Sequence, residues 1–169
     1  MYINPAQITI YNATADDIPV IAQLASVIWP AAYAEILTPP QLKYMLDLIY
    51  SNSALEKQMN EGDQFLLLKE DEKPIAFASY NLIKEPGIYK LQKLYALPNQ
   101  QGKGIGKKLI DYIINKIKSS GATALQLNVN RHNKAKQFYE HLGFKVIYEE
   151  DIDIGNGYFM NDYVMELKM

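Results

Sequence analysis

Three glycines occupy every second position of a short stretch that also carries three lysines. The stretch reads QGKGIGKK, from Gln101 to Lys108, and an apolar helical pattern follows it. An interior glycine costs about 0.5–1 kcal/mol relative to alanine, and a lysine in a first helical turn faces the positive end of the helix dipole. Because both choices oppose local stability, we expect a function that compensates for them.

That function is expected to be anion binding. Glycines lack a Cβ, so the backbone can curl until successive N–H groups converge, and the helix that follows adds a partial charge of about +0.5. A pyrophosphate would accept several charge-assisted hydrogen bonds there, each worth about 1.5–3 kcal/mol. The lysines Lys103, Lys107 and Lys108 would then be partners for a polyanion. A tight turn with solvated surface lysines is the alternative interpretation.

Two common phosphate-binding patterns do not fit these residues. A Walker loop needs four residues between its first glycine and Gly-Lys, followed by Ser or Thr, whereas three separate Gly102 from Gly106 and Lys108 follows Lys107. A dinucleotide fingerprint needs G-x-G-x-x-G, but the glycines here give G-x-G-x-G. The pattern that fits is Gln-x-x-Gly-x-Gly, from Gln101 to Gly106, between a strand and a helix.

The elements that must position this loop are predicted from hydrophobic periodicity and capping residues. Thr14 with Asp17 resembles a capping box, and Thr38 with Pro39 marks a second helix start. Expected helices are 14 to about 29, 38–50, 54–60, 105 to about 121 and 133–142, and expected strands are 8–11, 64–70, 74–83, 88–97, 124–129 and a terminal hairpin turning at 155–157. This order predicts a mixed α/β (α+β) sheet with helices on both faces.

Composition favours one globular domain over residues 1–169. The chain is 49% hydrophobic and 21% charged, and its longest apolar runs, such as FLLL, are too short to span a bilayer. A net charge of -2 argues against a nucleic-acid partner. The absence of cysteine excludes disulfides, thiolate metal sites and a cysteine nucleophile. No metal site is expected, and without a secretory signal pattern a cytoplasmic location is expected.

Two motifs in this order resemble one known family. LYALPNQQGKGIGKKLIDYI is similar to the acyl-CoA-binding motif of the GCN5-related N-acetyltransferase (GNAT) superfamily, and LNVNRHNKAKQFYEHLGFKV is similar to its second motif. The resemblance implies a GNAT-like, mostly antiparallel twisted sheet with a splayed pair of parallel central strands. It also implies acetyl-CoA as cofactor and an N-acetyltransferase activity.

The resemblance assigns roles to residues that match the motifs. The backbone N–H of Leu94 would polarise the thioester carbonyl, Ala96 would pair with pantetheine, and Tyr139 would protonate the leaving thiolate. Asn133 would cap its helix and help position the cofactor, although His132 occupies the place where most family members carry this asparagine. The cofactor-binding set is Leu94, Ala96, Gln101, Gly102, Lys103, Gly104, Ile105, Gly106, Lys107, Asn133 and Tyr139.

The general base and the acceptor are less well defined. Glu35, Tyr80 and Asp162 are candidate bases, each of which also fits a surface or rim position, and neither histidine is assigned. The segment from Trp29 to Gln58 is faintly similar to bacterial spermidine and spermine acetyltransferases. The acidic residues Glu149, Glu150, Asp151 and Asp153 could attract a polyamine, although a charged strand face also explains them.

A primary amine, with polyamines as one hypothesis, is therefore the expected acceptor. The alternative is a non-catalytic acyl-CoA sensor or a protein-interaction module on the same fold. A homodimer is one assembly to consider, and no residue of the sequence decides it.

Overall fold

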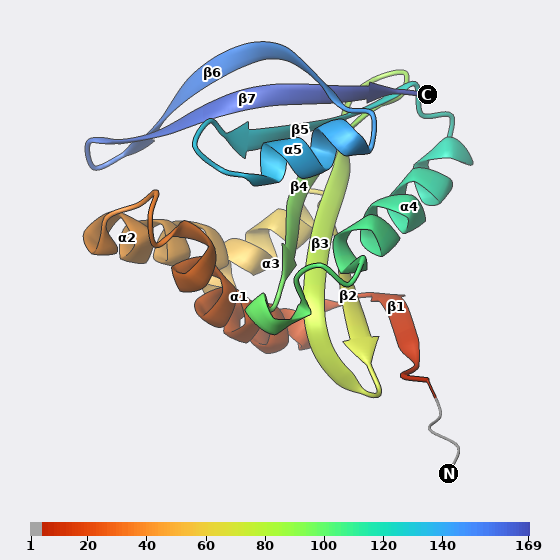
Figure 1. Ribbon diagram of the computed structural model, residues 1–169, viewed down its shortest axis with the longest axis horizontal. Coiled ribbons are helices and arrows are strands. Elements are labelled where there is room, and N and C mark those ends of the chain that lie inside the picture. Colours follow the sequence, from red (N-terminus) through yellow and green to blue (C-terminus); the bar gives the residue numbers. More distant parts are fainter. Residues whose placement is uncertain (1–4) are drawn as a thin grey trace. The chain divides into compact units, whose positions relative to one another are not determined.

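The computed structural model describes residues 5–169 of the chain (Figure 1). Its helices are α1 (Ile18–Tyr33), α2 (Pro39–Tyr50), α3 (Asn52–Asn60), α4 (Ile105–Lys118) and α5 (Ala135–His141), with 3₁₀ turns η1 (Ala15–Asp17) and η2 (Pro98–Gln100). Its strands are β1 (Ile8–Asn12), β2 (Gln64–Glu70), β3 (Lys73–Lys84), β4 (Ile88–Ala96), β5 (Ala124–Asn130), β6 (Lys145–Gly155) and β7 (Tyr158–Lys168). Each element predicted from the sequence is present.

The chain forms two compact units. Within the described residues, unit 1 holds the chain up to Ser79 together with Lys93–Tyr112, and unit 2 holds Tyr80–Gln92 together with Ile113–Met169. Strands β3 and β4 and helix α4 each give residues to both units. The single domain expected over 1–169 stays a prediction, and its first four residues lie outside the described range.

The strands follow the order β1-β2-β3-β4-β5-β7-β6, which confirms the predicted mixed sheet. The β1–β2, β5–β7 and β6–β7 pairs are antiparallel, whereas β4 and β5 are parallel. The parallel register runs from Ile88 opposite Ala124 to Leu91 opposite Leu127. Both strands continue past it, β4 to Ala96 and β5 to Asn130. The splay between the two parallel strands is predicted for these continuing segments.

Capping residues define the helices of unit 1. The Thr14 N–H donates to the Asp17 carboxylate over 2.9 Å before α1, and the Thr38 hydroxyl accepts from the Gln41 N–H at the start of α2. The predicted end of α1 near Trp29 is wrong, because the helix passes Pro30 and ends at Tyr33. We attribute the extra turn to aromatic packing of Tyr33 on Trp29, four residues earlier, at 4.6 Å between ring centroids.

An aromatic cluster fills the core of unit 1 between the helices and the strands. Trp29 of α1 contacts Tyr50 of α2 edge-on, and Tyr50 contacts Phe77 of β3 in the same way. The Trp29 indole N–H also donates to the Tyr50 hydroxyl over 3.2 Å, which satisfies both buried polar groups.

Among the residues that the structure describes, no helix has the length and apolarity needed to cross a membrane.

A long hairpin of β6 and β7 dominates unit 2 (Figure 1). Its two-residue turn places Asn156 at φ 56° and Gly157 at φ 79°, as an Asn-Gly turn between right-twisted strands requires. Helix α5 contacts β5 and ends as the sequence predicts: Gly143 takes φ 100° and the Phe144 N–H donates to the Tyr139 carbonyl over 3.1 Å.

Candidate functional site

The glycine loop of unit 1 has the backbone that the sequence predicts. Gly102 and Gly104 have φ values of 77° and 75°, which side-chain-bearing residues rarely adopt. A Cβ built on either glycine meets nothing within 4 Å, so backbone conformation and not crowding within the chain explains the glycines. Gly106 has no positive φ, because it lies within α4, which begins at Ile105 as the sequence predicts. The loop therefore has open space where a ligand's phosphates could approach the backbone.

Helix α4 follows this loop directly. The first helical hydrogen bond runs from the Lys108 N–H to the Gly104 carbonyl over 3.1 Å. The N–H groups of the first helical turn, which Ile105 opens, have no intrahelical acceptor and are suited to an anion. The side-chain amide of Gln101 donates to the Ala96 carbonyl over 3.5 Å. This bond ties the loop to the end of β4, which carries the other predicted cofactor residues of unit 1.

The predicted phosphate partner Lys107 is engaged in an ion pair. Its ammonium lies 2.7 Å from the Asp111 carboxylate one turn along α4, and both side chains are more than half exposed. An exposed pair of this kind contributes only about 0.3–0.5 kcal/mol, so a phosphate could displace it. The loop lysine Lys103 is exposed.

Gln100, which sequence reasoning missed, precedes the loop. Its side chain is buried, and its Oε1 atom has no hydrogen-bond partner within the described chain. A buried acceptor without a partner is unfavourable by about 1–3 kcal/mol. Gln100 directly precedes Gln101, the first residue of the glycine-loop motif.

Lys93 is a second residue that the sequence did not single out. It lies on β4 directly before Leu94 with 8% of its surface exposed, and its ammonium donates to Gln58 Oε1. The ammonium also lies 5.2 Å from the Phe65 ring centroid and 5.8 Å from that of Tyr50. Burial lowers the pKa of Lys93 to about 8, against a smaller opposing effect of Asp63.

This lysine predicts how stability depends on pH. Between pH about 8 and 10.5, Lys93 is neutral in the folded protein and protonated in the unfolded chain, so the unfolded state binds more protons. The free energy of unfolding is therefore expected to rise with pH across this range, by roughly 3 kcal/mol in total. Urea denaturation at pH 7.5, 9 and 10.5 measures it.

Two variants isolate the effect. Lys93→Met should lose this rise, while Lys57→Met should keep it, because the Lys57 side chain is 75% exposed. Equal pH slopes for Lys93→Met and the unmodified protein would contradict the assignment.

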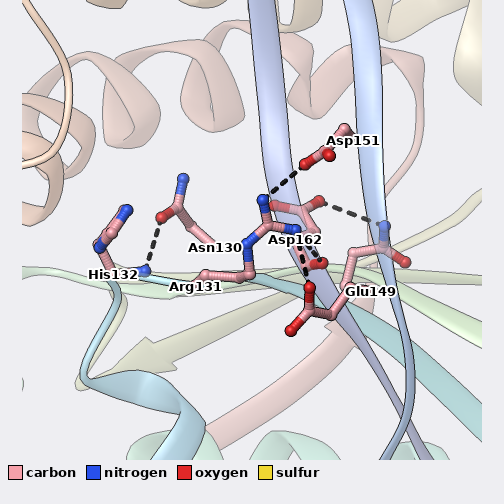
Figure 2. Close-up of polar contacts among 7 residues, drawn as sticks. Asn130, Arg131, His132, Glu149, Asp151 and Asp162 are labelled. Atoms are coloured by element: carbon pink, nitrogen blue, oxygen red, sulfur yellow. Dashed lines mark hydrogen bonds and ion pairs between the residues drawn. The ribbon is translucent and has the colours of Figure 1, made fainter.

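In unit 2, Asn133 caps α5 as predicted. Its Oδ1 atom accepts from the Ala135 N–H over 2.9 Å, and Lys134 already has helical dihedral angles. The neighbouring His132 uses its backbone N–H to bond Asn130 Oδ1 over 2.9 Å (Figure 2). The predicted contact of Asn133 with the cofactor stays a prediction.

Tyr139 is fixed in place by the local structure of α5. It is 9% exposed and makes edge-on contacts with Phe138 and Phe144, at 5.2 and 5.8 Å between ring centroids. Its carbonyl accepts the Phe144 N–H in the motif that ends the helix, so backbone and ring are held together. A phenol held this way loses little conformational freedom when it acts on a ligand.

The three candidate bases differ in burial. Glu35 is exposed, as a surface position requires, whereas Tyr80 and Asp162 are only 4% and 2% exposed. The rim position considered for these two is therefore wrong. Burial raises the pKa of the Asp162 carboxyl, and a hydrogen bond from Asn128 opposes this effect.

The acidic residues of β6 have partners. Arg131 pairs with Asp151 at 2.6 Å and with Glu149 at 3.8 Å (Figure 2). Asp153 accepts from the Gly155 N–H over 2.8 Å, and Glu150 accepts from Asn128 over 3.1 Å. Two of the four carboxylates are thus compensated by one guanidinium, which reduces the charge available to attract a polyamine.

The loop, the strand order and the second motif together define a GNAT-type acetyltransferase, and a comparison with known families agrees. The chain belongs to this family, since the model of the acetyltransferase (GNAT) domain matches residues 34–167. The predicted family, fold class and enzyme class are confirmed.

Individual relatives are similar over different parts of the chain. Spermidine N(1)-acetyltransferase of Thermoplasma acidophilum is 28% identical over 167 residues, covering 95% of this chain and 97% of the relative. The [ribosomal protein bS18]-alanine N-acetyltransferase of Haemophilus influenzae is 32% identical over 102 residues, covering 59% and 65%. The chain thus spans less than two thirds of the length of this second relative.

Solved structures resemble the fold closely. The PaiA N-acetyltransferase of Thermoplasma acidophilum, in complex with coenzyme A, has a TM-score of 0.81 at 27% identity and covers 96% of this chain and 99% of that one. YncA of Salmonella typhimurium, with its cofactor acetyl-CoA, has a TM-score of 0.66 at 19% identity, with coverage of 96% and 94%. The first of these two structures contains coenzyme A, which agrees with the cofactor that the resemblance to the family implies.

Proposed function

We propose that this protein transfers the acetyl group of acetyl-CoA to a primary amine by direct attack. The observation that carries the proposal is the pair of left-handed glycines, Gly102 and Gly104, at the N-terminus of α4 in a chain of the GNAT family. Acetyl-CoA supplies a thioester whose carbonyl carbon accepts the amine and whose thiolate leaves.

The residues would divide the work as follows. Backbone N–H groups from Gln101 to Gly106 hold the pyrophosphate, with Lys103 and Lys107 as further cofactor-binding residues, and Ala96 on β4 pairs with pantetheine. The Leu94 N–H donates to the carbonyl oxygen as negative charge develops on it, an effect worth about 3–4 kcal/mol for one such donor. Tyr139 gives its hydroxyl proton to the thiolate, and Asn133 positions the cofactor. In support, Leu94 and Ala96 lie past the parallel register of β4 and β5.

Polyamines are the acceptors that we favour. The relative named for spermidine acetylation matches nearly the full length of the chain, whereas the match to the alanine acetyltransferase covers 59% of it. Buried or partly buried carboxylates at Glu150 and Asp162 supply negative charge that Arg131 does not pair.

A cytoplasmic location and a homodimer also stay predictions, and gel filtration would check the homodimer.

An amine panel tests this function. The protein is incubated with acetyl-CoA and spermidine, spermine, a peptide with N-terminal alanine or lysine, and thiol release is followed. We expect turnover with spermidine and spermine above the rate without amine. If these two are inert while another amine reacts, the polyamine assignment is wrong. If the protein binds coenzyme A and acetylates nothing, the sensor alternative replaces the enzyme.

A further inference from the structure

Asp162 of β7 is a buried carboxylate with unusual surroundings. It is 2% exposed, and aspartate is rarely buried to this extent unless it is paired. Its Oδ2 atom accepts one hydrogen bond, from Asn128 Nδ2 over 3.2 Å. The same nitrogen donates to Glu150 Oε2 over 3.1 Å. One neutral amide therefore serves two carboxylates.

The neighbouring Arg131 guanidinium does not pair with the Asp162 carboxylate. The Arg131 guanidinium pairs with Asp151 and Glu149, and it reaches Asp162 only at the main-chain carbonyl oxygen, over 3.4 Å (Figure 2). Within residues 5–169 the Asp162 carboxylate makes no ion pair. It therefore keeps a strong affinity for a proton, and burial increases that affinity.

The strand registers place this carboxylate beside the open end of the parallel pair. Asp162 lies opposite Asn130 on β5 and opposite Glu150 on β6. Asn128 is the first residue of β5 past the register with β4, which ends at Leu127. The polar side chains of Asn128, Asn130, Glu150 and Asp162 thus share one face of β5, β7 and β6, next to the end of the β4–β5 ladder.

The opposite face of β7 meets α5. The Lys136 ammonium of this helix lies 5.2 Å from the ring centroid of Tyr163, the residue after Asp162. Since successive side chains of a strand point to opposite faces, Asp162 projects away from α5, the helix that carries Tyr139. Tyr139, the proton donor, and Asp162, the proton acceptor, would then lie on opposite faces of β7. Tyr139 would serve the departing thiolate, and Asp162 would serve the incoming amine.

We infer that Asp162 is the catalytic base that accepts the proton of the attacking amine, an inference that rests on the proposed function. The neutral amine nitrogen forms a bond to the acetyl carbonyl carbon, and its proton passes to the Asp162 carboxylate. The C–S bond breaks with its electron pair on sulfur, which takes the Tyr139 proton. The proton on Asp162 then returns to the Tyr139 phenolate through water. Asn128 and Glu150 are positioning residues.

The test compares three variants at saturating acetyl-CoA, with spermidine or the panel amine that reacts fastest. Asp162→Asn is expected to lower kcat by about 10²–10⁴-fold, the range for a general base, with little change in the KM of acetyl-CoA. Asp162→Glu should restore part of the rate. Asp151→Asn, which removes a neighbouring carboxylate paired with Arg131, should stay within threefold of the unmodified protein.

A pH profile gives a second readout. The rate should rise with pH through the pKa of Asp162, which burial and Glu150 raise while Asn128, Lys90 and Arg131 lower it. Asp162→Asn should lose this limb of the profile. Thermal unfolding and calorimetry with coenzyme A verify that the variant is folded and binds the cofactor.

Three outcomes would overturn the inference. The first is an unchanged kcat in Asp162→Asn, and the second is a defect confined to the KM of the amine, which would make Asp162 an ammonium-binding residue. The third is an unmodified protein that acetylates no amine. In that case the amine panel with the unmodified protein shows that the proposed function has failed, and the proposed role of Asp162 as base fails with it.

Discussion

Tyr139→Phe is expected to lower the kcat of acetyl transfer by about 10²–10⁴-fold while coenzyme A affinity stays within a few-fold. The variant keeps the ring that contacts Phe138 and Phe144, so α5 and its end should fold as before. It removes only the hydroxyl proton, and a coenzyme A thiolate that leaves without a proton donor is a poorer leaving group. Stopped-flow measurement of thiol release at saturating acetyl-CoA gives the result.

A matched tyrosine provides the control. Tyr148 on β6 is 52% exposed, and Tyr148→Phe should leave the rate unchanged. The assignment of Tyr139 would be lost if its phenylalanine variant kept the full rate, or if its rate fell only because coenzyme A binding weakened. The second result would show that the Tyr139 hydroxyl contributes to coenzyme A binding and not to proton donation.

Gly104→Val is expected to weaken coenzyme A binding by more than about 10-fold and to remove turnover at ordinary cofactor concentrations. A β-branched residue at φ 75° is strained by roughly 1–2 kcal/mol, and its side chain would occupy the open space beside the loop backbone. Losing one charge-assisted hydrogen bond to the pyrophosphate, worth about 1.5–3 kcal/mol, corresponds to about 10–150-fold in affinity. Calorimetric titration with coenzyme A measures it.

A variant at Gly62 is the control that distinguishes backbone strain from loss of coenzyme A binding. It has φ 109° in the turn between α3 and β2, and a Cβ there also meets nothing within 4 Å. Gly62→Val should therefore lose stability, as Gly104→Val does, but keep its affinity for coenzyme A. Equal affinities in the two variants would contradict the assignment of the loop.

Local signals made much of the fold predictable. The left-handed conformation at Gly102 and Gly143 and the turn at Asn156 depend on φ angles that few residue types tolerate, so the sequence alone indicates them. The capping role of Asn133 is equally local. The end of α1 was missed because proline usually stops a helix, and only tertiary aromatic contacts of Tyr33 offset that preference.

Burial of charged residues was not predictable in this way. Lys93 and Asp162 stand in strands whose patterns assign charged side chains to solvent, yet both are buried. Gln58 and the rings of Phe65 and Tyr50 surround Lys93, and those residues lie far from it in sequence. Pairings between distant strands likewise bring Asn128 and Asp162 together. The candidate loop could therefore be predicted locally, whereas the sequence named Asp162 only as one of three candidate bases and could not show its burial.

The position of β7 has a consequence for synthesis of the chain. It lies between β5 and β6, both of which precede it in sequence. While the ribosome is still adding residues 158–168, β5 and β6 each present an unsatisfied backbone edge, the kind that recruits other nascent chains. Mutations that delay insertion of this strand should therefore reduce the yield of native protein from cells more than they reduce the melting temperature of the purified protein.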